Sequence, residues 1–319
     1  SGSTGGAGIG SGENANYSGT VTINGGVVYA EGGADSTSIG RGNRAIGTSD
    51  NGAFTTGTGG NAVIVAPDGI GDPSGFADWD GIFISYEGNN TSATVGEDGT
   101  VHLNDTEANI QVWGEPVIDY PLVVESGTEL RVVQNDRNYA YATLEIGQDG
   151  KLTNNGTVTV DEGSTLILRE GLDQTDGSGT LECTGTVKLP PEDKLIALSG
   201  AEDLTYNGTE QSPEVSVTLN LWGYSHTYGN PADYTVTYTD ATNAGETAKA
   251  VITSTGAGDL LAGSASKTFV IQPAAYSINV SDGKWTVAHG ETQLLSKLPP
   301  ATISIDPSIQ DDLTGLRAG

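Results

Sequence analysis

The sequence predicts an all-β protein in three parts: a right-handed parallel β-helix over residues 1–189, an antiparallel β domain over residues 195–275, and a small β unit over residues 276–319. Three observations predict this class. Short runs of alternating apolar and polar residues end repeatedly at Gly, Asn or Asp. Similar segments recur along the first part at the spacing of a solenoid repeat. The Pro190-Pro191 pair then ends strand pairing and marks a domain boundary.

The first part contains many short runs with a period of two, the period of a strand with one buried face. They are "TVTING", "NAVIVA", "GIFISYEG", "TVHLND", "ELRVVQ", "TVTVDEG" and "TLILREG". No segment combines a helical apolar period with helix caps at both ends. The first part is therefore predicted to consist of strands.

Recurring segments predict that these strands stack in successive coils. The stretch "GAGIGSG" around Ile9 is echoed by "STSIGRG" around Ile39, and "GTVTINGG" is echoed by "GTVHLND" and "NGTVTVDEG". In a parallel β-helix, aliphatic side chains form inward ladders and Gly takes corners with positive φ. The opening Gly-x-Gly stretch is then a coil corner with Ala7 and Ile9 pointing inward, because a phosphate-binding loop would need a Gly-Lys-Ser/Thr ending and a helix.

After residue 189 the strands become longer. The runs "SPEVSVTL", "DYTVTYTD", "TAKAVITSTG" and "SKTFVIQP" are separated by frequent turns, which predicts a compact antiparallel domain. Residues 276–319 fit either strands of a further small unit or a strand pair docked on the preceding domain.

Residues 195–275 resemble the MBG-type Ig-like repeat of bacterial surface proteins. The resemblance rests on the Tyr206-Asn207-Gly208 opening, the Asn243-Ala244-Gly245 turn and the Lys267-Thr268-Phe269 terminal strand. The sequence departs from the repeat at "NLWGYSHTYGNPA", which is longer and more aromatic. The resemblance implies an Ig-like fold for this part.

The first part resembles, less specifically, the Gly-rich coils found beside such repeats in surface proteins of gut-dwelling Firmicutes, and β-helix modules described as carbohydrate-binding. These resemblances imply a secreted, wall-associated protein of the bacterial cell surface, whose outer end binds a ligand. They do not identify the ligand.

Composition narrows the range of partners. Thirteen Lys and Arg against 41 Asp and Glu give a formal net charge of −28, which disfavours nucleic acid and anionic membranes. Cys183 is the only cysteine, so an intramolecular disulfide and a cysteine metal cluster are excluded. No apolar run reaches the length of a membrane span.

Aromatic side chains are the candidate ligand-binding residues. Flat rings flanked by amides and carboxylates suit a sugar, which offers C–H patches and hydroxyls. The alternative is that the rings plug the ends of the coils and of the second domain. The candidates are Phe76, Trp79, Tyr139, Tyr141, Trp222, Tyr224 and Tyr228.

The acidic segment "APDGIGDPSGFADWDG" is a candidate calcium site or a solvated loop. Calcium requires about six to eight oxygen ligands, which carboxylates and backbone carbonyls could supply. The order of the acidic residues does not match an EF-hand loop. The candidate ligands are Asp68, Asp72, Asp78 and Asp80.

Catalytic signatures are weak in this sequence. His102, His226 and His289 lie in separate regions without metal-ligand spacing, and there is no Gly-x-Ser-x-Gly elbow. The sequence therefore predicts a non-enzymatic surface adhesin region that binds a glycan or host glycoprotein. The alternatives are a binder of a host protein such as immunoglobulin, a purely structural stalk, or a polysaccharide lyase or hydrolase of the β-helix type.

Overall fold

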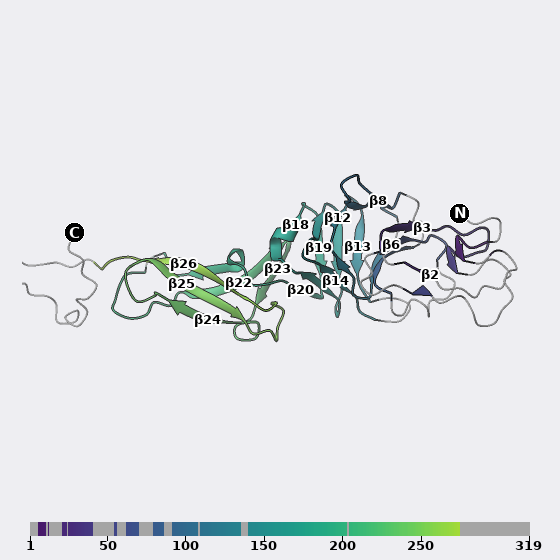
Figure 1. Cartoon of the computed structure of the whole chain (residues 1–319). Helices are drawn as coiled ribbons and strands as arrows, with labels where there is room; N and C mark the ends of the chain where they lie inside the picture. The colour runs from purple at the N-terminus through teal and green to yellow at the C-terminus, as the bar shows by residue number, and fades with distance from the viewer. Residues whose placement is uncertain are drawn as a thin grey trace, which may run out of the picture. The chain divides into compact units, whose positions relative to one another are not determined.

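The all-β class is confirmed by the computed structural model (Figure 1). It describes residues 6–10, 12, 21–23, 25–40, 54–55, 62–69, 79–85, 91–107, 109–134, 140–202 and 204–274. Over these ranges the regular elements are β-strands and two short 3-10 turns, η2 (Gly171–Gln174) and η3 (Asp193–Leu195).

Seven strands form the longest sheet of the first part. In spatial order they are β19, β16, β13, β10, β7, β6 and β3. Their bounds are β3 (Val27–Tyr29), β6 (Ala62–Val65), β7 (Gly81–Ser85), β10 (Asn109–Trp113), β13 (Glu129–Val132), β16 (Thr157–Val160) and β19 (Thr180–Cys183).

Two further sheets accompany the seven-stranded sheet. The five-stranded sheet contains β8 (Ala93–Val95), β9 (Val101–Leu103), β12 (Pro121–Val124), β15 (Lys151–Asn154) and β18 (Thr175–Asp176). The four-stranded sheet contains β11 (Val117–Ile118), β14 (Thr143–Ile146), β17 (Thr165–Leu168) and β20 (Thr186–Lys188).

The chain visits these three sheets in a fixed cyclic order. From β9 to β20 it passes through the five-stranded, the seven-stranded and the four-stranded sheet, in that order, four times. Each strand pairs in parallel with the strand of the next round, so that Ile110 lies beside Leu130 and Pro121 lies beside Lys151. These separations agree with the spacing of the sequence repeats, and Figure 1 shows these strands side by side.

Aliphatic rows form the core of this region. In β14, β16 and β17 every second residue is buried, as the alternating sequence predicts. In-register pairing places buried residues beside one another, so Leu144, Leu166 and Val187 form one row across the four-stranded sheet. Buried aliphatic side chains therefore lie in rows across neighbouring strands.

Parallel pairing does not hold throughout, which corrects the expectation for residues 1–189. Strands β7 and β10 pair antiparallel, with Gly81 opposite Trp113, and β8 and β9 also pair antiparallel. Strand direction in the seven-stranded sheet thus reverses once, between β7 and β10. The reversal cannot be deduced from period-two runs, which are the same for both directions.

The opening glycines lie where two backbones approach closely. Strand β1 (Ile9–Gly10) pairs in parallel with β4 (Ile39–Gly40), so the two echoed segments lie in register. A Cβ on Gly8 would collide with the backbone of Glu31 and Ser38, and Ile9 packs against a buried apolar cluster. A second short pair joins β2 (Val21–Thr22) to β5 (Phe54–Thr55).

The later strands form two three-stranded sheets. One contains β21 (Ile196–Ser199), β22 (Glu214–Leu221) and β23 (Tyr224–Tyr228), and the other contains β24 (Tyr234–Thr239), β25 (Gly245–Ser254) and β26 (Ser264–Ile271). The chain divides into two compact units. The first consists of residues 1–195, 217–235 and 253–265, and the second of residues 196–216, 236–252 and 266–319.

Candidate functional site

Trp79 lies in the core. It is 2% exposed and packs edge-on against Phe83 and Trp113, with ring centroids 6.4 and 6.2 Å apart. Its ring is therefore covered by protein and offers no flat face to a ligand. Phe76 lies outside the described residues.

Two of the four candidate calcium ligands already accept hydrogen bonds from the main chain. Asp68 Oδ2 accepts from Gly32 N at 2.8 Å, and Asp80 Oδ1 accepts from Glu115 N at 2.8 Å. Asp72 and Asp78 lie outside the described residues, so the calcium prediction stays a prediction. In the part of the chain that the structure describes, no three His, Cys, Asp or Glu side chains gather in a way that could hold a metal ion.

Trp222 belongs to a tight hairpin that is hydrogen-bonded to β18 and β19. Trp222 and Gly223 form the two-residue turn between β22 and β23, with φ of 48° and 82°, as such turns require. Trp222 Nε1 donates to the Asp176 carbonyl at 3.1 Å, and Leu181 N donates to the Trp222 carbonyl at 3.0 Å. The half-buried indole thus takes part in anchoring the hairpin.

Tyr224 and Tyr228 lie on one face of the same hairpin. Tyr228 is 2% exposed, and its hydroxyl donates to the Val187 carbonyl at 3.4 Å. Burial raises the pKa of Tyr224 to about 12, with a smaller contribution from neighbouring Cys183. Burial likewise raises the pKa of Tyr228 far above its ordinary value. These rings cover β19 and β20, as the plugging alternative expects.

Among the candidate aromatics that the structure describes, Tyr141 has the most open ring. It is 53% exposed and lies just before the start of β14. A Cβ on Gly163 would collide with Cδ1, Cε1 and Cζ of the Tyr141 ring, so the ring lies against the bare backbone of the turn that precedes β17. Gly163 has φ of +86°, a conformation that also favours glycine. Tyr139 lies outside the described residues.

Polar rows continue from Tyr141 across the outward face of the four-stranded sheet. Pairing places Thr143, Thr165 and Thr186 beside one another on three successive strands. All three side chains are partly exposed, and within the described structure their hydroxyls have no protein hydrogen-bond partner. These hydroxyls are available to water or to a ligand.

An ion pair borders the threonine row. Arg169 Nη2 and Nε donate to Glu145 Oε1 at 2.6 and 2.9 Å. The Glu145 side chain is 17% exposed and that of Arg169 is 48% exposed, so the guanidinium covers the carboxylate. Ile167 and Lys188 continue the Glu145 row on the next two strands.

We call this surface the Tyr141 face. It comprises Tyr141, Thr143, Glu145, Thr165, Ile167, Arg169, Thr186 and Lys188. The aromatic member was predicted from the sequence. The other members were missed, because each row joins residues that lie far apart in the sequence. The sequence signal that was available is the recurring "GST" and "GT" that end in Thr165 and Thr186.

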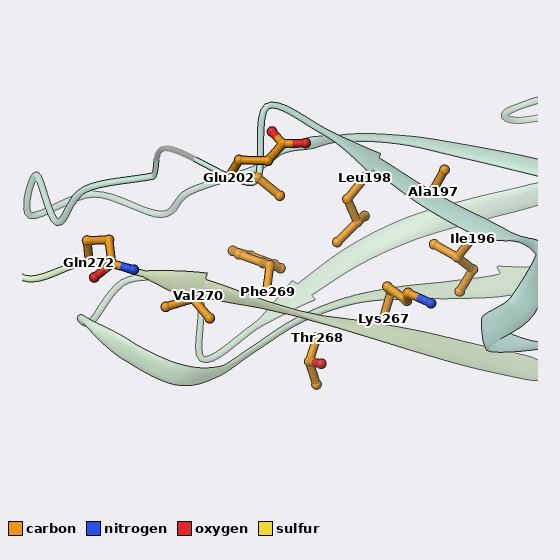
Figure 2. A pocket seen from close by; sticks show the side chains of 10 residues that line it. Ile196, Ala197, Leu198, Glu202, Lys267, Thr268, Phe269, Val270 and Gln272 are labelled. Atoms are coloured by element: carbon orange, nitrogen blue, oxygen red, sulfur yellow. The ribbon is translucent and has the colours of Figure 1, made fainter.

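A groove in the second unit was also missed (Figure 2). It has a volume of about 450 Å³ and lies between β21 and β26. Its apolar floor includes Phe269, Leu198 and Ala201, which also belong to the core of that unit. Polar side chains, Glu202, Lys267 and Gln272, lie at its margin. The groove is thus the open margin of a core rather than a site with converging polar groups.

Comparison with protein-family models, with curated proteins and with solved structures finds no match for this chain. Among the described residues, no helix is long and apolar enough to cross a membrane.

Proposed function

We propose that this chain is a non-enzymatic region of a bacterial cell-surface protein, and that it binds a glycan or a host glycoprotein on the Tyr141 face. The observation that carries the proposal is the half-exposed Tyr141 ring, which lies on the Gly163 backbone beside a row of threonine hydroxyls that have no hydrogen-bond partner among the described residues. The extracellular location remains part of the proposal, supported by the sequence resemblance.

A parallel β-helix is the architecture proposed for the three sheets, right-handed where strands pair in parallel from β9 to β20. Support comes from the cyclic visiting order and from in-register aliphatic rows. For residues 195–275 we propose an MBG-type Ig-like domain, supported by two three-stranded sheets within that range.

Sugar binding fits the chemistry of the Tyr141 face. An aromatic ring with one open side attracts the C–H patches of a sugar ring, and nearby hydroxyls exchange hydrogen bonds with sugar hydroxyls. Arg169 and Glu145 add a charged donor and acceptor held in fixed positions by their mutual ion pair. The net charge of −28 disfavours nucleic acid as an alternative ligand.

A structural stalk is the second candidate function. Ion pairs that join successive coils favour it, such as Lys151 with Asp176 at 3.0 Å and Arg169 with Glu145. The burial of Trp79 and Tyr228, two candidate binding aromatics, favours it as well.

The test is a glycan array, followed by calorimetry with the glycans that bind. We expect Tyr141→Ala to weaken binding about fivefold or more, because stacking contributes roughly 1 kcal/mol or more. Tyr29→Ala is the matched control, since Tyr29 is another partly exposed tyrosine, on β3.

Gly163→Ala supplies an independent variant. It keeps the aromatic side chain but displaces its ring, so binding should weaken while Tyr141 is still present. Equal binding by wild type and Tyr141→Ala would refute the proposed site. If no glycan binds and the protein captures a serum protein equally well with and without Tyr141→Ala, the host-protein alternative is favoured, at another surface. If neither a glycan nor a serum protein binds, the structural stalk is favoured.

A further inference from the structure

On the outward face of the four-stranded sheet, the side chains change in chemical type along a strand but repeat from one strand to the next. From the residues just before β14 into the strand, the outward side chains change from aromatic Tyr141 to hydroxyl Thr143 to carboxylate Glu145. Across the strands the hydroxyl repeats, because Thr143, Thr165 and Thr186 lie in register. Neighbouring strands are about 4.8 Å apart, so the hydroxyls form a regular row.

A repeating row suits a repeating ligand. A polysaccharide presents similar hydroxyls at each successive sugar, so a chain lying across β14, β17 and β20 meets the same group on each strand. A chain lying along a single strand would meet different chemistry at every step. The three hydroxyls also lack partners within the described structure, so binding does not require an existing protein hydrogen bond to break.

Charge on the Tyr141 face indicates an uncharged ligand. The Glu145 carboxylate is largely covered and paired to Arg169, so of the charged side chains on this face Lys188 remains, and one cation cannot balance a charge on every sugar. The chain carries a net charge of −28, which repels a polyanion. A neutral polymer avoids this repulsion.

We infer that the Tyr141 face binds a neutral polysaccharide that runs across the strands, along the Thr143, Thr165 and Thr186 row, with one sugar on Tyr141. This inference rests on the proposed function and specifies its ligand class and direction. It makes Thr186, two strands away from Tyr141, a contact used only by longer oligosaccharides.

The test measures affinity against ligand length by calorimetry. The probes are cello-, xylo-, manno- and malto-oligosaccharides, from disaccharide to hexasaccharide, with polygalacturonate as the polyanion. Thr186→Val removes one hydroxyl and keeps the side-chain shape. We expect it to weaken binding of the hexasaccharide about three- to tenfold, the worth of one hydrogen bond, and to leave the disaccharide unaffected.

Thr157→Val is the matched control, because Thr157 is a partly exposed threonine on β16 of the seven-stranded sheet. We also expect nearly constant affinity between about 0.05 M and about 0.5 M NaCl, since an uncharged ligand is not screened.

Three outcomes would overturn the inference, and they separate it from the proposed function. If Tyr141→Ala abolishes binding while Thr186→Val changes the affinity for no oligosaccharide, whatever its length, the inferred direction of the polysaccharide is wrong and the proposed function stands. If polygalacturonate binds in a Tyr141-dependent manner and the neutral series does not, the ligand class is wrong. If no glycan binds at all, the proposed function fails and the inference fails with it.

Discussion

Single residues at strand ends and in turns decide how closely neighbouring segments approach. Gly163 allows the Tyr141 ring to lie on its backbone, and Asn154 joins the end of β15 to β19 from within the core. Asn154 is fully buried; its Nδ2 donates to the Thr180 carbonyl at 2.9 Å and its Oδ1 accepts from Gly156 N at 3.1 Å. A buried amide whose donor and acceptor are both hydrogen-bonded stabilises this position, because an apolar side chain would leave the two backbone groups without these partners.

Replacing Asn154 tests this stabilisation. Asn154→Ala removes a donor and an acceptor and leaves the Gly156 N–H without this partner, so we expect a loss of about 2–3 kcal/mol in the free energy of unfolding. Urea unfolding followed by circular dichroism measures it. Asn155→Ala, at the exposed neighbouring position, should cost much less; equal costs would contradict the role assigned to Asn154.

Much of the stacked region could be predicted from the sequence, because each strand carries its own period and each repeat its own corner. The echo between Ile9 and Ile39 corresponds to actual pairing. Burial of Trp79 could not be predicted, since it depends on Phe83 and Trp113, which lie in β7 and β10. The Glu145–Arg169 pair depends on the register of β14 against β17, which no local sequence pattern contains.

At the scale of elements, the β22–β23 hairpin covers the end of the seven-stranded sheet. Strand β19 is the last strand of that sheet, and a bare last strand invites pairing with another chain. The Trp222 carbonyl accepts from Leu181 of β19, while Tyr224 and Tyr228 cover the strand end.

Alkaline pH should loosen this hairpin. The pKa of Tyr224 is about 12 in the folded protein, against an ordinary value of 10.0. The unfolded chain therefore loses this proton first, so the stabilisation is complete below about pH 10 and falls as the pH rises towards about 12. Urea midpoints measured across this range should decline, and Tyr224→Phe should reduce the decline.

Tyr141→Phe is the control for that series, because its ring is exposed. A decline of equal steepness in wild type and Tyr224→Phe would show that other groups cause the alkaline loss. Tyr228 and Tyr120, whose pKa values burial also raises, would then be the next residues to test.

At the scale of the whole molecule, negative charge dominates. Thirteen basic residues cannot neutralise 41 acidic ones, so the carboxylates repel one another at long range. The ion pairs between coils, such as Lys151 with Asp176, are exposed and each contributes little.

Salt should therefore stabilise this protein. Raising NaCl from about 0.01 M to about 0.5 M shortens the Debye length from roughly 30 Å to a few ångströms and suppresses the long-range repulsion. We expect the melting temperature, measured by calorimetry, to rise. A fall would mean that the loss of ion pairs such as Lys194 with Asp173 outweighs the relief of repulsion.

The reversal of strand direction between β7 and β10 limits how such a protein can change in length. Duplication of a whole turn on either side of this boundary would add strands that match their neighbours in direction. A duplicated segment spanning the boundary would instead import a second reversal. Natural variants should therefore gain or lose turns separately on the two sides of this boundary. The antiparallel pair of strands at the boundary should be retained in all of them.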